Sequence, residues 1–262
     1  MSYIFIYGRP GTGKTTLAAS MAELGYGVTF IDVDEKLRNM KNLEAKIKSG
    51  AIDVITLDER LSTSTLRQRI LTPSIALAKQ PKGYLKFCDL VSGYEKLIQE
   101  AGPDAVVPIW PKQVLVLDSL TSLLEHLTRL ISSIQKKERF TFDEWGILLS
   151  NLEDLFYATM ALQKLFKHVI IIAHEQAEID EETHRVTAVL PAIQGSMRNK
   201  VGKYFEEIYR TTAVHNKSSG RTEYQVLTRA VDKCDARTSR DLPVVAESSF
   251  KVLFKGEQAE ER

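Results

Sequence analysis

Cysteine is scarce in this chain, which carries only Cys88 and Cys234 among its 262 residues. Two cysteines so far apart form neither a disulfide framework nor a zinc site, so they are typical of a reducing compartment. Long hydrophobic runs are also lacking, because no apolar stretch approaches the ~18 residues of a membrane-spanning helix. No basic segment precedes the first apolar stretch, as it would in a signal peptide. We therefore expect a cytoplasmic protein without a membrane partner.

The chain also has almost no excess of charge, with a formal net charge of +1. Binding to nucleic acid cannot then rest on the overall field of the protein, and any anion-binding surface must be a local patch. The length is close to the upper limit for one hydrophobic core. We expect a single domain over residues 1–250, with an excursion at 59–112 that has no assigned role and a C-terminal tail at 251–262.

A phosphate-binding loop stands at the start of the sequence. Tyr3-Ile4-Phe5-Ile6-Tyr7 predicts a buried strand, residues 16–22 predict a helix, and the pattern G-x-x-x-x-G-K-[ST] lies between them. The glycines let backbone N–H groups surround phosphate oxygens, and the helix N-terminus adds partial positive charge. We expect Lys14 to reach the β- and γ-phosphates of ATP and Thr15 to ligate Mg²⁺. The predicted nucleotide-binding residues are Gly8, Arg9, Pro10, Gly11, Thr12, Gly13, Lys14, Thr15 and Thr16.

Buried strands and helices alternate along the rest of the chain. This alternation around a phosphate loop predicts an α/β fold, in which a mostly parallel sheet is covered by helices on both faces. Two hairpins are also predicted: residues 178–191, which would protrude with a polar tip, and a C-terminal hairpin around a turn at 216–220. Other predicted strands are 28–31, 53–57, 114–117, 169–173, 208–214 and 223–229. Helices are predicted at 37–48, 84–101 and 120–134, and a further long helix is predicted to end at about residue 166.

Acidic residues follow two of these strands. Asp118 closes the apolar run 114–117, and the carboxyl end of a parallel strand is where ligands bind, so we expect Asp118 to hold the Mg²⁺ shell. Many phosphate-loop ATPases place Glu next, where it polarises the attacking water, but here Ser119 follows. The base must come from elsewhere, and Asp34 and Glu35 are the candidates, both left open.

The sequence resembles RecA-like ATPases from Tyr3 to about Val245. Residues 30–37 resemble the segment that carries the catalytic carboxylate of RecA-type recombinases, with Asp34 at that position. Asp118-Ser119-Leu120 matches as well, and His174 ends a strand where RecA-like proteins carry a polar sensor of the γ-phosphate. The late segment D-K-C-D-A-R-T-S-R-D-L-P, at 232–243, is similar to that of compact phage ATPases of the Sak type, which are RecA-like single-strand annealing proteins.

The resemblance implies an ATP- and Mg²⁺-dependent, phage-encoded recombination protein, cytoplasmic in a bacterial host, whose hydrolysis is stimulated by DNA. It implies single-stranded DNA as a partner and a homo-oligomer, ring or filament, and it allows a single-strand-binding protein as a further partner. Lys233 and Arg237 would reach the γ-phosphate held by an adjacent subunit. Two connections would face DNA, and since the second is acidic in its first half, its contacts should come from its later cations. The implied DNA-binding residues are Lys136, Lys137, Arg139, Phe140, Arg198, Lys200 and Lys203.

Two other functions fit the same loop. The pattern G-x-P-G-T-G-K-T-T also occurs in phosphate-loop kinases of nucleotides and small metabolites, which would work as monomers with an Arg-rich lid. The chain could also be a RecA-like ATP switch that acts on protein partners and binds no DNA. Binding to a single-stranded oligonucleotide would separate these functions.

Overall fold

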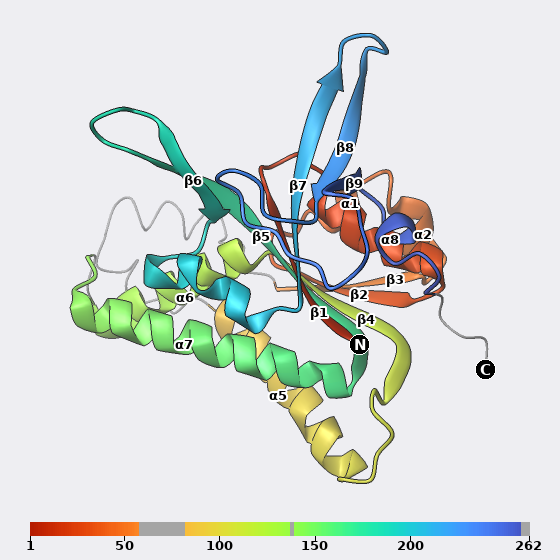
Figure 1. Ribbon diagram of the computed structural model, residues 1–262. Coiled ribbons are helices and arrows are strands. Elements are labelled where there is room, and N and C mark those ends of the chain that lie inside the picture. The colour runs from red at the N-terminus through yellow and green to blue at the C-terminus, as the bar shows by residue number, and fades with distance from the viewer. Residues whose placement is uncertain (58–81, 137–138, 258–262) are drawn as a thin grey trace.

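A twisted sheet of mainly parallel strands forms the centre of the computed structural model, which describes residues 1–57, 82–136 and 139–257 (Figure 1). Within these residues the strand order is β3-β2-β4-β5-β1-β7-β8-β9, and β6 lies off this path, paired with β5. The predicted fold class is confirmed. The strands are β1 Ser2–Gly8, β2 Gly27–Asp32, β3 Ile52–Thr56, β4 Trp110–Asp118, β5 Phe166–Ile179, β6 Val186–Pro191, β7 Glu207–Asn216, β8 Arg221–Leu227 and β9 Val245–Glu247.

Strand β1 is buried along its whole length, because helices cover both faces of the sheet. Tyr3, Phe5 and Tyr7 point to one side and pack in a core with α5, α6 and α7, while Ile4 and Ile6 point to the other, toward α1 and α8. The α-helices are α1 Lys14–Ala19, α2 Glu44–Lys48, α5 Gly83–Ala101, α6 Leu120–Gln135, α7 Phe142–Ala161 and α8 Phe250–Leu253; 3₁₀ turns are at Ser20–Leu24, Leu37–Asn39, Leu162–Lys164, Gly195–Asn199 and Val201–Tyr204.

The carboxyl ends of the central parallel strands meet at one edge of the sheet. Gly8 at the end of β1 is paired with His174 in β5, and Asp32 at the end of β2 is paired with Asp118 at the end of β4. In open α/β sheets, ligands bind at this edge. The fold thus brings together a loop, two acids and a histidine that are far apart in the sequence.

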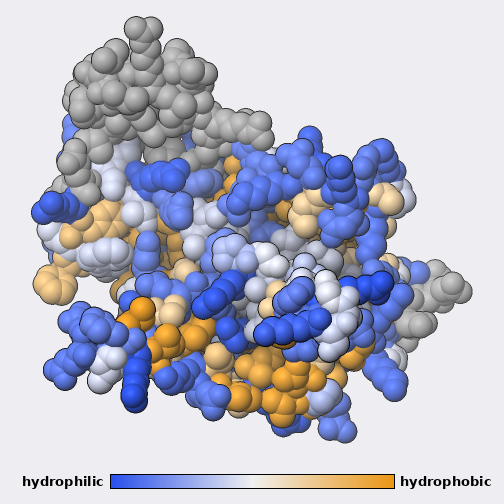
Figure 2. Space-filling view, turned by 90° about the horizontal axis from the view of Figure 1, so that it is seen from above, coloured by the Kyte–Doolittle hydropathy of each residue, from blue (hydrophilic) through white to orange (hydrophobic). Residues whose placement is uncertain are grey.

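Two hairpins protrude from the molecule on the side of this edge (Figure 1). The first arm is the hairpin of β5 and β6 with its tip at residues 180–185, and the second arm is the hairpin of β7 and β8 with its tip at 217–220. Both predicted hairpins are confirmed, although β5 continues without a break to Ile179, where the predicted strand ended at residue 173. Figure 2 looks down on this side, and most of it is hydrophilic.

The C-terminal segment differs from its prediction as a tail from residue 251. Phe250, Leu253 and Phe254 are fully buried against the same core as α1. Glu257 forms an ion pair with Arg240 at 3.0 Å, and its carboxylate lies 2.9 Å from His168 Nε2. Apolar residues at helical spacing therefore extend the domain beyond the predicted boundary.

The expected excursion at 59–112 is described only from residue 82 onward; residues 58–81 lie outside the described part. From Gly83 to Ala101 the chain forms α5, whose buried residues Tyr84, Phe87 and Val91 pack in the core beside α6. In the described residues no helix is long and apolar enough to cross a membrane.

Candidate functional site

The phosphate loop joins β1 to α1 and takes the shape that its glycines permit. Gly11 and Gly13 have positive φ angles of 79° and 86°, which residues with a side chain rarely adopt. Gly8 is required for a different reason, because a Cβ at this position would lie 2.3 Å from Thr211 Oγ1 in β7. The Nζ of Lys14 donates to the carbonyl oxygens of Gly8 and Arg9, each at 2.8 Å, so its side chain folds back over the loop.

A cavity of about 600 Å³ opens beside this loop. It contains the catalytic candidates Lys14, Asp34, Asp118 and His174, which the sequence places on four different segments. Glu35 is not among its lining residues, so the geometry favours Asp34 as the base. The remaining lining residues are Pro10, Gly11, Gly13, Thr15, Thr16, Asp32, Lys36, Leu37, Met40, Asn42, Tyr224 and Ser248.

Thr15 and Asp118 meet as a magnesium site requires. Thr15 Oγ1 donates to Asp118 Oδ2 at 2.6 Å, which puts a hydroxyl and a carboxylate side by side at the start of α1. Oxygen ligands of this kind suit Mg²⁺, which commonly binds to one or two protein groups and to the phosphates of its nucleotide. Within the described residues no group of three or more His, Cys, Asp or Glu side chains could hold a metal by itself. The pair therefore fits a metal that arrives with a nucleotide.

Burial shifts the pKa values of Asp118 and Lys14, the two charged groups at the centre of the site, in the direction that favours their uncharged forms. Desolvation raises the pKa of Asp118 to about 6, and the charges of Asp34 and Asp32 raise it further, against the hydrogen bond from Thr15. Desolvation lowers the pKa of Lys14 to about 8, although the nearby acids, Asp118 first, oppose this. Positive charge from a metal would favour the Asp118 carboxylate, and phosphate would favour the Lys14 ammonium.

The segment after β2 is shaped by a buried acid that the sequence analysis did not single out. Asp32 accepts hydrogen bonds from the backbone N–H of Leu37 at 2.9 Å and of Lys36 at 3.3 Å, so it fixes the turn that follows. Asp34 projects from this turn into the cavity and lies 3.6 Å from Lys36 Nζ. The predicted helix at 37–48 is interrupted here, with a 3₁₀ turn first and α2 only from Glu44.

His174 lies at the point where β5 leaves the central sheet. Its backbone N–H donates to Thr121 Oγ1 at 3.0 Å, which ties the strand to α6. Its buried Nδ1 has no hydrogen-bond partner in the described part of the chain. Desolvation, with the nearby charge of Lys14, lowers the pKa of this imidazole. His174 also lines the cavity, where a neutral imidazole is able to bond a phosphate oxygen or a water. Its role as a sensor of the γ-phosphate stays a prediction.

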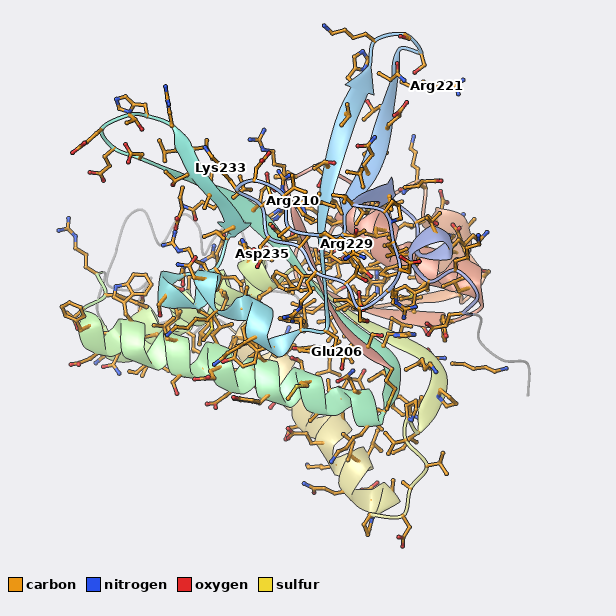
Figure 3. All side chains as sticks on the ribbon, viewed as in Figure 1. Glu206, Arg210, Arg221, Arg229, Lys233 and Asp235 are labelled. Atoms are coloured by element: carbon orange, nitrogen blue, oxygen red, sulfur yellow. The ribbon has the colours of Figure 1, made fainter. Side chains whose placement is uncertain are left out.

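The residue after His174 anchors a network that the sequence analysis missed. Glu175, with a side chain only 4% exposed, accepts from Arg210 Nε at 2.8 Å and from Arg9 Nε at 3.2 Å. One carboxylate therefore links the phosphate loop to the bases of both arms, since Glu175 lies in β5 and Arg210, labelled in Figure 3, lies in β7. Arg9 itself is 76% exposed and, like Gly8 and Thr12, does not line the cavity.

The two cations predicted to act on a neighbouring subunit lie outside the cavity. Lys233, labelled in Figure 3, and Arg237 are exposed side chains on the segment after β8. Lys233 Nζ donates to the carbonyl of Val186 in the first arm, and Arg237 Nη2 donates to the carbonyl of Gly202 at 2.7 Å. Their proposed role in trans stays a prediction.

The predicted DNA-binding residues fall into two groups. Arg198 is paired with Glu178 at 3.2 Å and Lys203 with Glu153 at 3.1 Å, so part of their charge is already compensated. The other cations are exposed and have no acidic partner among the described residues, and Lys137 lies outside the described part. Phe140 forms an edge-to-face pair with Trp145 at 5.1 Å between ring centroids. The unpaired cations are Lys136, Arg139 and Lys200.

The chain is similar to known proteins over nearly its whole length. A family model described as "AAA domain" matches residues 2–239. Similar solved structures include the flagellar accessory protein FlaH from Methanocaldococcus jannaschii, at 15% identity and a TM-score of 0.42, covering 86% of this chain and 76% of that one. Another is a KaiC-like protein from Pyrococcus horikoshii OT3, at 13% identity and a TM-score of 0.37, covering 92% of this chain and 82% of that one. No curated protein gives a significant sequence match.

Proposed function

We propose, on the premise that this chain belongs to the AAA domain family and is a P-loop ATPase of RecA-like fold, that it hydrolyses Mg²⁺-ATP and binds single-stranded DNA as an oligomer. The observation that carries the ATPase assignment is the convergence of Lys14, Thr15, Asp118 and Asp34 on one cavity. When bound, Mg²⁺ supplies positive charge that offsets the charge developing on the transferred phosphate.

Each residue at this site has a distinct task in hydrolysis. Lys14, whose Nζ already lies over the loop, provides a cation for the phosphate chain. Asp34 provides a carboxylate that orients the attacking water and accepts its proton. His174, which lines the cavity, offers its imidazole to the terminal phosphate or to that water. Because His174 lies in the strand that continues into the first arm, the arm and the phosphate site share one backbone.

Binding to single-stranded DNA is supported by cations beside aromatic rings. Arg139 is exposed and adjacent to Phe140, and Trp145 in α7 is 39% exposed. Bases stack on such rings while cations neutralise the backbone, which suits single strands of any sequence. Lys136 and Lys200 are exposed and form no ion pair within the described residues. The ion pairs of Arg198 and Lys203 make those two weaker candidates than the sequence suggested.

A second function is favoured by the apolar surface where α6 gives way to α7. Phe142 is 95% exposed and Ile134 is 56% exposed, and neither forms part of the core. Exposed apolar side chains that join into one contiguous patch mark contacts with other proteins. An ATP switch that acts on a protein partner is therefore the alternative to DNA binding.

The test is binding of fluorescent oligo-dT at several salt concentrations, with and without ATP. Each phosphate neutralised on a single strand adds roughly −0.7 to the slope of log affinity against log salt, so Lys136→Ala combined with Lys200→Ala should flatten the slope by ~1.4. Lys48→Ala, an exposed lysine paired with Glu44 on α2, is the matched control and should leave the slope unchanged. Absence of binding would favour the switch, and phosphate transfer to a metabolite by a monomer would favour a kinase.

A further inference from the structure

The cavity extends beyond the groups that serve phosphate and metal. Past the loop it is lined by Met40, Asn42, Tyr224 and Ser248, none of which carries a charge. Its volume of about 600 Å³ lies within the usual range for small-molecule sites. Ligand sites of this kind are largely apolar, with a few polar groups that fix orientation. This uncharged part suits the portion of a nucleotide that is not phosphate.

Tyr224 is the conspicuous side chain in this part of the cavity. It comes from β8 in the second arm, is 47% exposed, and is the only Phe, Tyr or Trp among the described lining residues. Its ring lies against the phosphate loop, because a Cβ at Gly13 would be 3.2 Å from Tyr224 Cδ1. Its hydroxyl has no hydrogen-bond partner in the described residues. An exposed aromatic ring at the rim of a phosphate-binding site can stack with another flat ring.

The backbone around Tyr224 is firmly held. Its carbonyl oxygen accepts from the N–H of Ser248 at 3.2 Å, which places Ser248 beside it. The segment then enters α8, where the N–H of Phe250 donates to Ser20 Oγ at 2.8 Å and the ring of Phe250 is fully buried. This wall of the cavity is therefore preorganised, which lowers the entropy lost on binding.

We propose that Tyr224 is the base-stacking residue of the nucleotide site and that the ligand is a purine nucleoside triphosphate. The base lies on the exposed side of the ring, with Ser248 and Asn42 as the polar groups near its edge and the ribose. A purine is favoured because its two fused rings cover more of the tyrosine face than a pyrimidine does. The assignment rests on the proposed ATPase function, and it adds specificity for the base to a loop that recognises only phosphate.

The experiment compares ATP with inorganic tripolyphosphate, both with Mg²⁺, by calorimetric titration of the full chain. Base stacking on an aromatic side chain is worth enough that Tyr224→Ala should raise the Kd for ATP about 5- to 150-fold. The Kd for tripolyphosphate should not change, and Tyr224→Phe should bind ATP like the wild type. Val214→Ala, at a position in the same arm that is also 47% exposed, is the matched control. For the wild type, CTP should bind more weakly than ATP and GTP.

The outcomes separate this inference from the function on which it rests. An unchanged or tighter Kd for ATP in Tyr224→Ala would overturn it, and so would equal loss of ATP and tripolyphosphate, since the ring would then only support the loop. Equal affinity of wild type for ATP and CTP would overturn the purine assignment. If wild type binds neither ATP nor tripolyphosphate, the ATPase proposal itself fails.

Discussion

The hydroxyl groups of Thr12 in the phosphate loop and Thr211 in β7 share a hydrogen bond of 2.7 Å. Thr211 also packs directly against Gly8, so the loop is held at two points by one residue of the second arm. Together with the ion pair of Arg210 and Glu175 and the contact of Tyr224 with Gly13, this makes the second arm part of the nucleotide site. The predictions that follow test the parts of that site.

Replacing Lys14 by Ala should abolish nucleotide binding or turnover. The substitution removes the cation that would neutralise the phosphates without disturbing the sheet, because within the described residues Lys14 donates only to carbonyl oxygens of its own loop. ATPase rate and ATP affinity are the measurements, and circular dichroism confirms that the variant is folded. Lys48→Ala serves as control. Activity like that of the wild type in Lys14→Ala would refute the site.

Asp34→Asn should keep affinity for ATP and lose hydrolysis by roughly 10²- to 10⁴-fold, the usual contribution of a general base. Glu35→Gln should have little effect, because Glu35 does not line the cavity. Single-turnover hydrolysis and equilibrium binding, measured separately, distinguish the two steps. If only Glu35→Gln loses hydrolysis, the base has been assigned to the wrong carboxylate.

Affinity for Mg²⁺-ATP should be greatest between about pH 6 and pH 8. Asp118 must be ionised to hold metal, and its pKa of about 6 in the free protein means that affinity is present above this pH and lost as pH falls through it. Lys14 must be charged, and with a pKa of about 8 its contribution is present below that pH and lost as pH rises. Titrations with Mg²⁺-ATP from pH 5 to 9 test both the loss of affinity at low pH and the loss at high pH. In Asp118→Asn the loss of affinity for Mg²⁺-ATP at acidic pH should no longer be seen.

The two arginines that form ion pairs with Glu175 should contribute differently to the free energy of unfolding. Arg210 is largely buried, with 18% of its side chain exposed, and its loss leaves a buried carboxylate with only an exposed partner. Arg210→Ala should therefore lower the free energy of unfolding by about 3 kcal/mol. Arg9→Ala should cost less than ~1 kcal/mol, since that cation is screened by solvent. Urea unfolding measures both, and equal losses would contradict the network as described.

Subunits with complementary defects should restore activity if Lys233 and Arg237 act across an interface. A cation supplied in trans to the transition state is worth roughly 10³- to 10⁵-fold in rate. Mixing the double variant Lys233→Ala/Arg237→Ala with Lys14→Ala leaves some interfaces with both functional halves. ATPase activity of the mixture above that of either variant is the expected result. A monomeric mass with ATP bound, and no recovery on mixing, would exclude the trans arrangement.

Local sequence patterns were sufficient to predict the phosphate loop, the buried strands and both hairpins. Each of these depends on residues close together in the chain. The same reasoning could not find Arg210 or Thr211, because only the parallel pairing of β7 with β1 brings them beside Tyr7 and Gly8. No local signal marks Tyr224 either, since an aromatic residue in an exposed strand is ordinary.

Ion pairs formed over long sequence separations explain a further difference. The sequence predicts Arg198 and Lys203 as cations without acidic partners, because their ion-pair partners lie 20 and 50 residues away along the chain. The buried C-terminal helix, in contrast, did leave a signal. Phe250, Leu253 and Phe254 follow the spacing of one apolar helical face, which the acidic residues after them obscured.

The unbroken course of β5 has a mechanical consequence. The strand is clamped at its start, where His168 is completely buried between Tyr26 and Phe254, and beyond His174 it leaves the central sheet and pairs with β6. At about 3.3 Å per residue, Ile179 stands roughly 16 Å past His174. A small change in the direction of the strand at His174 produces a displacement that grows with distance along the strand. The displacement is therefore larger at the tip of the first arm than at the histidine. A fluorescent probe on the tip at 180–185 is therefore placed to report events at the phosphate site from outside it.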